Sequence, residues 1–299
     1  MTSGVLVLAG PTASGKTELA LELAEAFEAE IVGADSRQIY RGMPIGTAAP
    51  NAEARRRIPH HLVEFLDPHE RYSAARFTQD ALETIDQIHA RGRRAIVAGG
   101  TGFYLRALCG DVELSSAYDP ELRARLAREA RIHPMQTLHD WLAARDPERA
   151  RAVAPTDPYR IVRALEIALT VERAAANSDS AHSSLRARGI PFLKVAVDLD
   201  DALLGERIGA RVDGMLESGL LDEAERVGAS AVAADAVGYP QALAYLAGLL
   251  TRAELRTLLI RATRRYAKRQ RTWFRGEPDM RHIARGEVAR AARELPGWT

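Results

Sequence analysis

The residues with the clearest chemical potential lie close to the start of the chain. Residues 10–17 read GPTASGKT and match the pattern G-x-x-x-x-G-K-[ST]. The glycines let the backbone curl until several N–H groups point at one anion, while Lys16 adds a positive charge and the Thr17 hydroxyl can hold a Mg²⁺ that bridges phosphate oxygens. The segment predicts a P-loop formed by Gly10, Pro11, Thr12, Ala13, Ser14, Gly15, Lys16 and Thr17.

A strand before this loop and a helix after it must position it. Residues 5–9 are an apolar run typical of a buried strand, and residues 18–24 have helical spacing. A bound phosphate therefore also meets the positive end of a helix dipole. The alternative is a glycine-rich turn that binds nothing. Against it, the lysine and the threonine of the pattern are present in addition to both glycines. The loop does not identify its ligand, since a diphosphate is enough to fill it.

A carboxylate is expected at the same edge of the sheet. Residues 30–35 read as a second strand that ends at Asp35 and is followed by the polar turn Ser36, Arg37 and Gln38. Ligands of open parallel sheets bind at the carboxyl ends of the strands, where the P-loop also lies. Asp35 could hold Mg²⁺, act as a general base or only cap the following turn.

A third candidate follows the next buried strand. Residues 95–98 are apolar and lead into Gly99-Gly100-Thr101-Gly102, after a helix predicted over residues 74–90. The glycines let the backbone approach a ligand closely, and the Thr101 hydroxyl can donate to it. A tight turn that binds no ligand explains the same residues.

The alternation of strands and helices stops between residues 118 and 173, where three helical patterns follow one another, and a strand returns at residues 192–199. We expect an α/β core, residues 1–112 and 191–299, interrupted by a helical insertion, residues 113–190. Within the insertion, Pro158 suits a first helical turn capped by Asp157. Arg160 and Arg163 share one face of that helix, which is either a solvated face or a phosphate-binding surface.

The end of the chain is strongly basic. A helix predicted over residues 252–275 carries Tyr266, Trp273 and Phe274 among its cations, which are Arg261, Arg264, Arg265, Lys268, Arg269, Arg271 and Arg275. Basic and aromatic residues together indicate a nucleic-acid surface, although ion pairing with acidic neighbours explains them too.

Composition sets wider limits. The 299 residues are 46% hydrophobic and 27% charged, as in an ordinary globular protein, and the net charge of +1 means that any nucleic-acid site must be local. The single cysteine, Cys109, cannot form an internal disulfide and is expected in the core. No export signal or membrane-spanning run is apparent, so we expect a cytoplasmic protein.

Five stretches, taken together, resemble one family, the tRNA dimethylallyltransferases, also called tRNA isopentenyltransferases. They are GPTASGKT (10–17), ADSRQIY (34–40), GGTGFY (99–104), DPYRIVRALE (157–166) and YAKRQRTWFR (266–275). The resemblance extends in order over nearly the whole chain. It implies a P-loop NTPase-like parallel sheet flanked by helices, with an all-helical insertion.

The resemblance also implies a reaction. A dimethylallyl group moves from dimethylallyl diphosphate to N6 of the adenosine 3′-adjacent to the anticodon, and diphosphate is released. Residues 12–17 would hold the diphosphate with Mg²⁺ on Thr17, and Arg211, with Arg207 as a second candidate, would neutralise its charge. Asp35 would take a proton from the N6 amine. The implied catalytic residues are Asp35, Thr101 and Arg211.

The implied partners are tRNA and dimethylallyl diphosphate, with no membrane, no obligate protein partner and a monomeric enzyme. The adenosine must leave its stack to reach the site. The implied tRNA-binding residues are Asp35, Ser36, Arg37, Gln38, Thr101, Arg123, Tyr159, Arg160, Ile161, Val162 and Arg163.

Three other functions fit part of the pattern. A P-loop alone is typical of a nucleoside or metabolite kinase, but no ATP-base pocket or arginine-bearing lid can be identified. Prenylation of free AMP or ATP needs neither the helical insertion nor the basic terminal helix. An RNA-binding protein without catalysis needs neither Asp35 nor an intact P-loop.

Overall fold

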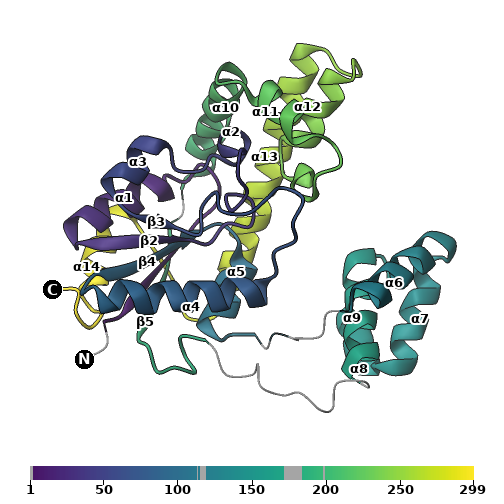
Figure 1. Ribbon diagram of the computed structural model, residues 1–299, viewed down its shortest axis with the longest axis horizontal. Helices are drawn as coiled ribbons and strands as arrows, with labels where there is room; N and C mark the ends of the chain where they lie inside the picture. Colours follow the sequence, from purple (N-terminus) through teal and green to yellow (C-terminus); the bar gives the residue numbers. More distant parts are fainter. Residues whose placement is uncertain (1–2, 113, 115–118, 172–183, 198) are drawn as a thin grey trace. The chain divides into compact units, whose positions relative to one another are not determined.

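The computed structural model describes residues 3–112, 114, 119–171, 184–197 and 199–299. The chain divides into two compact units, one formed by Met1–Val112 and Ser183–Thr299 and the other by Glu113–His182 (Figure 1). The predicted end of the insertion at residue 190 is therefore too late, because Leu185 and Ile190 are buried in the core of the first unit. The sequence of residues 174–184 has no helical or strand periodicity and predicts a mobile loop; apart from Ser184, these residues lie outside the described part of the chain.

The first unit is built on a parallel sheet. Within the described residues it has six strands in the order β3-β2-β4-β1-β5-β6, and every pair is parallel. The strands are β1 (Val5–Ala9), β2 (Ala29–Gly33), β3 (His60–His61), β4 (Arg94–Gly99), β5 (Phe192–Val197) and β6 (Met280–Ile283). All five residues of β1 and of β2 are buried, as expected for strands covered on both faces.

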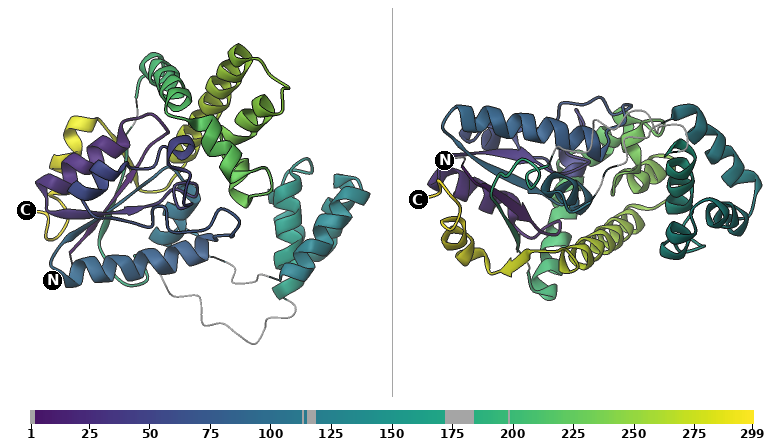
Figure 2. Two further views of the ribbon diagram at one scale, coloured as in Figure 1. Left: turned by 45° about the horizontal axis from the view of Figure 1, so that its top comes forward. Right: turned by 90° about the horizontal axis from the view of Figure 1, so that it is seen from below.

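Helices cover both faces of this sheet (Figures 1 and 2). One face packs against α1 (Lys16–Ala26) and α14 (Val288–Ala292), with α3 (Ala52–Arg57) nearby. The other packs against α4 (Ala74–Ala90) and α5 (Gly102–Cys109). Helix α4 forms because its apolar residues recur at helical spacing and Ser73 caps its first turn. The prediction of a core cysteine is confirmed, since Cys109 is fully buried and burial raises the pKa of its thiol to about 12.

A group of helices adjoins the loop that follows β2. It comprises α2 (Pro44–Thr47), α10 (Asp201–Glu217), α11 (Leu220–Val227), a 3-10 helix (Val232–Asp235), α12 (Tyr239–Leu246) and α13 (Arg252–Arg275). These helices share a core with Ile39 and Met43, in which Tyr239 is fully buried. Helix α13 has the predicted bounds, and a capping box between Thr251 and Glu254 fixes its start.

The second unit is helical. Its elements are α6 (Pro120–Ile132), α7 (Met135–Arg145), α8 (Pro147–Ala152) and α9 (Pro158–Val171). Helices α6, α7 and α9 pack around a core that includes Leu126, Leu142 and Leu165. The predicted cap of α9 is confirmed, because the Asp157 carboxylate accepts a hydrogen bond from the Arg160 N–H at 3.0 Å. No helix in the described part of either unit is long and apolar enough to cross a membrane.

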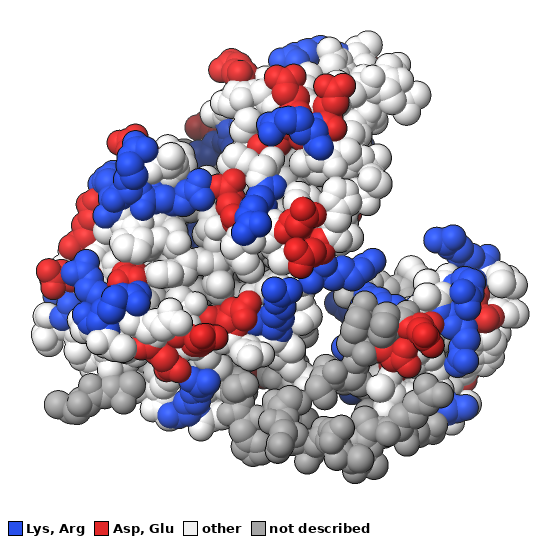
Figure 3. Space-filling view, in the orientation of Figure 1, with Lys and Arg blue, Asp and Glu red and all other residues white. Residues whose placement is uncertain are grey.

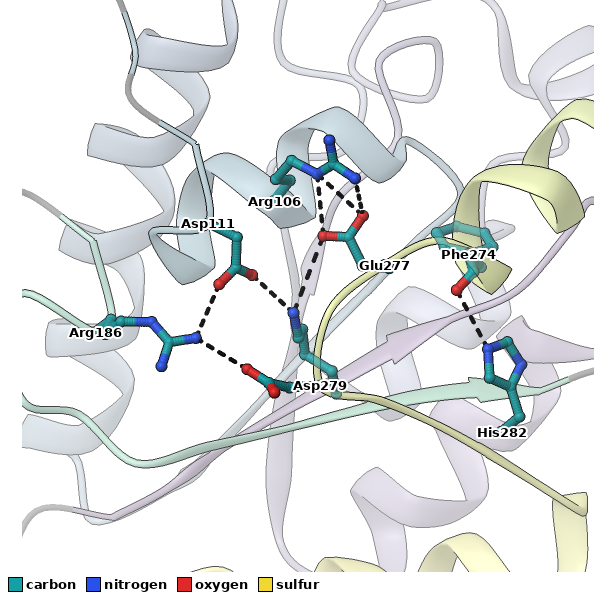
Figure 4. Close-up of polar contacts among 8 residues, drawn as sticks. Arg106, Asp111, Arg186, Phe274, Glu277, Asp279 and His282 are labelled. Atoms are coloured by element: carbon teal, nitrogen blue, oxygen red, sulfur yellow. Dashed lines mark hydrogen bonds and ion pairs between the residues drawn. The ribbon is translucent and has the colours of Figure 1, made fainter.

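Ion pairs connect the two segments of the first unit that flank the insertion (Figure 4). Asp111, just before the crossing, lies 2.8 Å from Arg186, just after it, and 2.7 Å from the Nζ of Lys194 on β5. Lys194 is only 2% exposed and also lies 4.0 Å from Glu277, which pairs with Arg106 at 2.9 Å. Burial opposes ionisation of Asp111, but hydrogen bonds from Lys194 and Arg186 outweigh it and lower the pKa of this carboxyl.

Removing the buried ammonium group tests this cluster. We expect Lys194→Met to lower the free energy of unfolding by about 3 kcal/mol, because it leaves the carboxylates of Asp111 and Glu277 short of a buried partner. Urea denaturation measures the loss. The matched control is Arg188→Met, which breaks an exposed pair with Asp86 and should cost less than about 1 kcal/mol. Equal losses in the two variants would show that the Lys194 pairing adds nothing beyond an ordinary surface contact.

Candidate functional site

Three adjacent strands bring the predicted site residues together. Strand β4 lies between β1 and β2, and Ala9 at the end of β1 pairs with Gly99, while Gly33 at the end of β2 pairs with Ala98. Because the pairing is parallel and the strands end level, the P-loop, the turn after β2 and the turn after β4 leave the sheet side by side. The predicted meeting of these segments at one edge is confirmed.

The P-loop has the backbone that its glycines predict. Gly15 has a φ of +83° and stands at the N-cap of α1, which begins with Lys16. Guanidinium groups of Arg207 and Arg285 crowd the space where a Gly15 side chain would begin. The Ser14 hydroxyl is buried and has no hydrogen-bond partner among the described residues. A cradle with two nearby cations and an unsatisfied buried hydroxyl suits an anionic ligand.

Lys16, Asp35 and Arg211 act on one another electrostatically. Burial lowers the pKa of Lys16, the Asp35 carboxylate opposes the shift and Arg211 reinforces it. Burial likewise lowers the pKa of Arg211, and Asp35 again opposes the shift. The carboxylate of Glu18 opposes both shifts as Asp35 does. The guanidinium group of Arg207 lies at the same loop, beside Gly15, so the positive charge around the loop would be offset by an anionic ligand.

Asp35 is held in a defined turn. Its Oδ1 accepts a hydrogen bond from the Arg37 N–H at 2.9 Å, so part of the alternative reading, that it caps the following turn, also holds. The Thr101 hydroxyl accepts from the Ser36 N–H at 2.9 Å and donates to the Ser36 Oγ at 3.2 Å. Thr101 therefore fixes the turn that carries Asp35, and no hydrogen bond joins the second carboxylate oxygen of Asp35 to the described residues of this turn.

The neighbouring side chains Arg37 and Gln38 are also braced. Arg37 pairs with Asp235 at 2.6 Å, and the Gln38 amide donates to the carbonyl groups of Thr47 and Ala48 at 3.2 and 3.0 Å. The loop that accepts these bonds is fixed in turn by the buried Glu223. Its carboxylate accepts hydrogen bonds from the Ile45 N–H, the Gly46 N–H and the Tyr239 hydroxyl, each within 2.9 Å.

A cavity of about 250 Å³ connects these groups. Thr12 of the P-loop, Asp35 and Arg211 all contribute to its wall. Polar residues that also line it are Ser36, Arg37, Gln38, Thr47, Asp235, Thr263, Tyr266, Arg269 and Gln270, and apolar ones include Val212, Met215, Val237 and Leu259. Such a mixture suits a ligand with a charged end and an apolar end.

Among the residues at this site that were not predicted as site residues, two form hydrogen bonds with the P-loop. Gln270 accepts a hydrogen bond from the Thr12 N–H at 2.8 Å and donates to the Gly100 carbonyl at 2.9 Å. Arg285 donates to the Gly15 carbonyl at 3.0 Å and pairs with Glu22 at 2.6 Å. A signal for Gln270 exists, because it interrupts the buried stripe formed by Ala267 and Phe274 on α13. Nothing in the sequence near Arg285 connects it with the P-loop.

Of the predicted tRNA-binding residues of the insertion, residues 159–163 lie on one helix, α9, but not in one environment. Tyr159 is 70% exposed, and Arg160 is exposed and pairs with Asp157 at 3.4 Å. Arg163 pairs with the buried Glu166 at 2.8 Å, and Val162 is half-buried. The side chain of Ile161 is fully buried in the core of the helical unit, so it is not exposed at the surface on which the tRNA contact is predicted. Arg123 is half-buried on α6, which packs against α9.

Surface charge is mixed on the face shown in Figure 3, where Lys and Arg alternate with Asp and Glu over the α/β unit. This agrees with a net charge of +1 and with the inference that any nucleic-acid site is local. No group of three or more His, Cys, Asp or Glu residues in the described ranges is arranged to hold a metal ion. A divalent cation here would depend on oxygens of its ligand as well as on the protein.

The lowered pKa of Lys16 predicts how anion binding varies with pH. The charged ammonium favours an anion, so the affinity for inorganic diphosphate should fall as the pH rises through this pKa, which lies below the ordinary 10.5. Calorimetric titrations from about pH 7 to about pH 10 measure it. Lys16→Arg should weaken binding but flatten its alkaline decline, because a guanidinium keeps its charge. The control, Lys268→Arg at an exposed position of α13, should keep the wild-type profile; an unchanged decline in Lys16→Arg would contradict the assignment.

Comparisons with known proteins agree with this geometry. The family described as IPP transferase matches residues 38–277, a range that begins just after Asp35. A tRNA dimethylallyltransferase of Geobacter sulfurreducens is 41% identical over 93% of this chain and 91% of its own length, and tRNA dimethylallyltransferase 1 of Citrifermentans bemidjiense is 44% identical over 92% and 90%. These alignments reach well beyond the matched family range.

Solved structures give the same result. A full-length tRNA isopentenylpyrophosphate transferase from Bacillus halodurans superposes with a TM-score of 0.69 at 33% identity, covering 98% of this chain and 95% of its own. A eukaryotic dimethylallyltransferase acting on tRNA superposes with a TM-score of 0.74 at 25% identity, covering 95% and 74%. The predicted P-loop NTPase-like fold is confirmed. Its sheet, its cavity and these relatives together establish that the chain belongs to the IPP transferase family.

Proposed function

We propose that this protein transfers a dimethylallyl group from dimethylallyl diphosphate to N6 of the adenosine 3′-adjacent to the anticodon of a tRNA, releasing diphosphate. The observation that carries the proposal is the single cavity lined by Thr12 of the P-loop, Asp35 and Arg211. A leaving-group site and a candidate base face the same space there. The names of the relatives support the same reaction class.

The transfer balances with residues of this cavity and with Lys16 of the P-loop that contributes to its wall. The bond between the allylic carbon and the diphosphate oxygen breaks, and its electron pair leaves with diphosphate. Lys16 and Arg211 stabilise the charge that develops there. The N6 nitrogen forms the new bond to carbon, and its proton passes to the carboxylate of Asp35. An exocyclic amine is a weak nucleophile. The reaction therefore needs a base that removes the amine proton and positive charge that stabilises the leaving diphosphate.

The residues of the P-loop also suit a Mg²⁺ ion bound together with diphosphate. Thr17 is half-buried in the first turn of α1, and the unsatisfied Ser14 hydroxyl lies in the same loop. We assign Thr17 as the protein's Mg²⁺ ligand. Bound there, the ion adds positive charge at the leaving group.

The two substrates divide the cavity by polarity. The dimethylallyl chain would lie against Val212, Met215 and Leu259, which supply apolar surface. The acceptor adenosine, once out of its stack, would meet Ser36, Arg37 and Gln38 beside Asp35.

On the helical unit, exposed Tyr159 and Arg160 are suited to contact the anticodon stem-loop, with Val162, Arg163 and Arg123 beside them. Tyrosine can stack on an unstacked base and arginine can pair with phosphate. We further propose that the enzyme acts as a monomer.

A labelled-substrate assay tests the proposal. Purified protein is incubated with unmodified tRNA, labelled dimethylallyl diphosphate and Mg²⁺, and parallel reactions offer AMP as acceptor or [γ-³²P]ATP as donor. We expect label in tRNA alone, at the adenosine beside the anticodon. Label in AMP would make free nucleotide the acceptor, and phosphate transfer from ATP would make the protein a kinase.

Replacing the candidate base separates catalysis from binding. Asp35→Asn should lower kcat by about 10²–10⁴-fold, because the amide cannot accept the amine proton. The affinity for tRNA, measured by filter binding, should stay unchanged. Asp67→Asn, at an exposed carboxylate outside the cavity, is the control and should keep full activity. A large loss of tRNA affinity in Asp35→Asn would reject Asp35 as a dedicated base.

A further inference from the structure

Gln270 is a buried polar side chain that joins two parts of the site. It is 6% exposed on α13, a helix that lies outside the strands and loops carrying the P-loop and Asp35. Its Oε1 accepts from the Thr12 N–H at 2.8 Å, and its Nε2 donates to the Gly100 carbonyl at 2.9 Å. One amide thus bonds the diphosphate loop after β1 and the turn after β4.

The amide of Gln270 packs directly against the backbone of Gly100. A side-chain carbon on Gly100 would lie 2.3 Å from the Gln270 Nε2 and 3.5 Å from the Asp35 Oδ2. The candidate base, the turn and the amide are therefore packed around one point, which only glycine leaves open. A shift of Gln270 would disturb the wall against which Asp35 lies.

Glutamine is suited to this place by its two different ends. The Thr12 N–H needs an acceptor and the Gly100 carbonyl needs a donor, and a neutral amide supplies both without adding charge beside Lys16 and Asp35. A carboxylate would supply only the acceptor, and an apolar residue neither. In a buried position each unmet group is costly, so the pair of bonds defines one arrangement of loop and turn.

We propose that Gln270 is a positioning residue that sets the distance between the diphosphate loop and the base Asp35. It contacts neither the transferred carbon nor the reacting nitrogen in this role, and acts through Thr12 and Gly100. The inference rests on the proposed function for its catalytic consequence, but its effect on the P-loop stands apart from tRNA.

The test uses the full-length protein and two substitutions. Gln270→Met removes both hydrogen bonds at similar size, and Gln270→Glu keeps only the acceptor for Thr12. Gln87→Met, on the exposed side of α4, is the matched control. Three quantities are measured: kcat with both substrates saturating, the dissociation constant of tRNA, and the affinity for inorganic diphosphate with Mg²⁺.

We expect Gln270→Met to lower kcat by about 10²-fold, the cost of a small misplacement of reacting groups, while tRNA affinity stays at the wild-type value. Diphosphate affinity should fall about tenfold, because the loop loses its Thr12 bond. Gln270→Glu should lose kcat but retain more diphosphate affinity than Gln270→Met, since its carboxylate still accepts from Thr12. The Gln87→Met control should match wild type throughout.

A substitution at Gly100 tests whether Gln270 acts through its contact with this residue. Gly100→Ala displaces the Gln270 amide without changing its chemistry, so it should cause the same kinetic loss, and the double variant with Gln270→Met should lose less than the two single losses combined. Wild-type kcat in Gln270→Met would overturn the inference, as would equal losses of kcat, tRNA affinity and thermal stability. A wild-type protein that fails to modify tRNA would instead overturn the proposed function, and diphosphate affinity would still decide the role of Gln270.

Discussion

Strand β4 pairs in parallel with β1 on one side and with β2 on the other, and the rest of the site depends on this pairing. The paired ends, Ala9 with Gly99 and Gly33 with Ala98, make three loops start at the same level of the sheet. A shift by one residue would turn every side chain of a strand to the opposite face. The pairing therefore fixes the loops with a precision that no loop could achieve by itself.

The strand ends fix where the three loops begin but not the course of each loop. Hydrogen bonds from buried polar side chains fix that course. Thr101 fastens the turn after β2, Glu223 fastens the loop that bears Gly46, and Gln270 joins the P-loop to the turn after β4. All three are partly or fully removed from water, where a missing hydrogen bond costs more than a made one gains. A displacement of the reactive groups would therefore break buried hydrogen bonds and cost free energy.

Much of this could be predicted from the sequence, because the signals are local. An apolar run next to a glycine-rich segment specified β1 and the P-loop, and the spacing of apolar residues gave α4 and α13 their correct bounds. The burial of Ile161 could not be predicted, for the opposite reason. The sequence motif covers all the residues of one helical turn alike. Whether each of their side chains is buried depends on the residues that pack against it, and these come from other helices.

The rest of the site could not be predicted because it depends on contacts between distant positions. Nothing near Glu223 indicates that its carboxylate binds the start of α2, and nothing near Arg285 indicates Gly15. The end of the insertion was placed too late for the same reason. An apolar residue such as Leu185 could belong to either unit, and only its contacts with distant residues of the first unit assign it to that core. Charge pairs such as Arg186 with Asp111 are equally invisible to a local pattern.

The contact between Thr12 and Gln270 spans 258 positions, and the Trp298 indole donates to the Gly4 carbonyl at 2.9 Å from the last turn of the chain. During synthesis the P-loop therefore emerges from the ribosome long before the amide that binds it. Long-range pairing of this kind is slow, since the intervening chain must be ordered first. The nascent protein therefore carries an unbraced phosphate loop until α13 has been synthesised, and competence for its substrates arises only when this helix has docked.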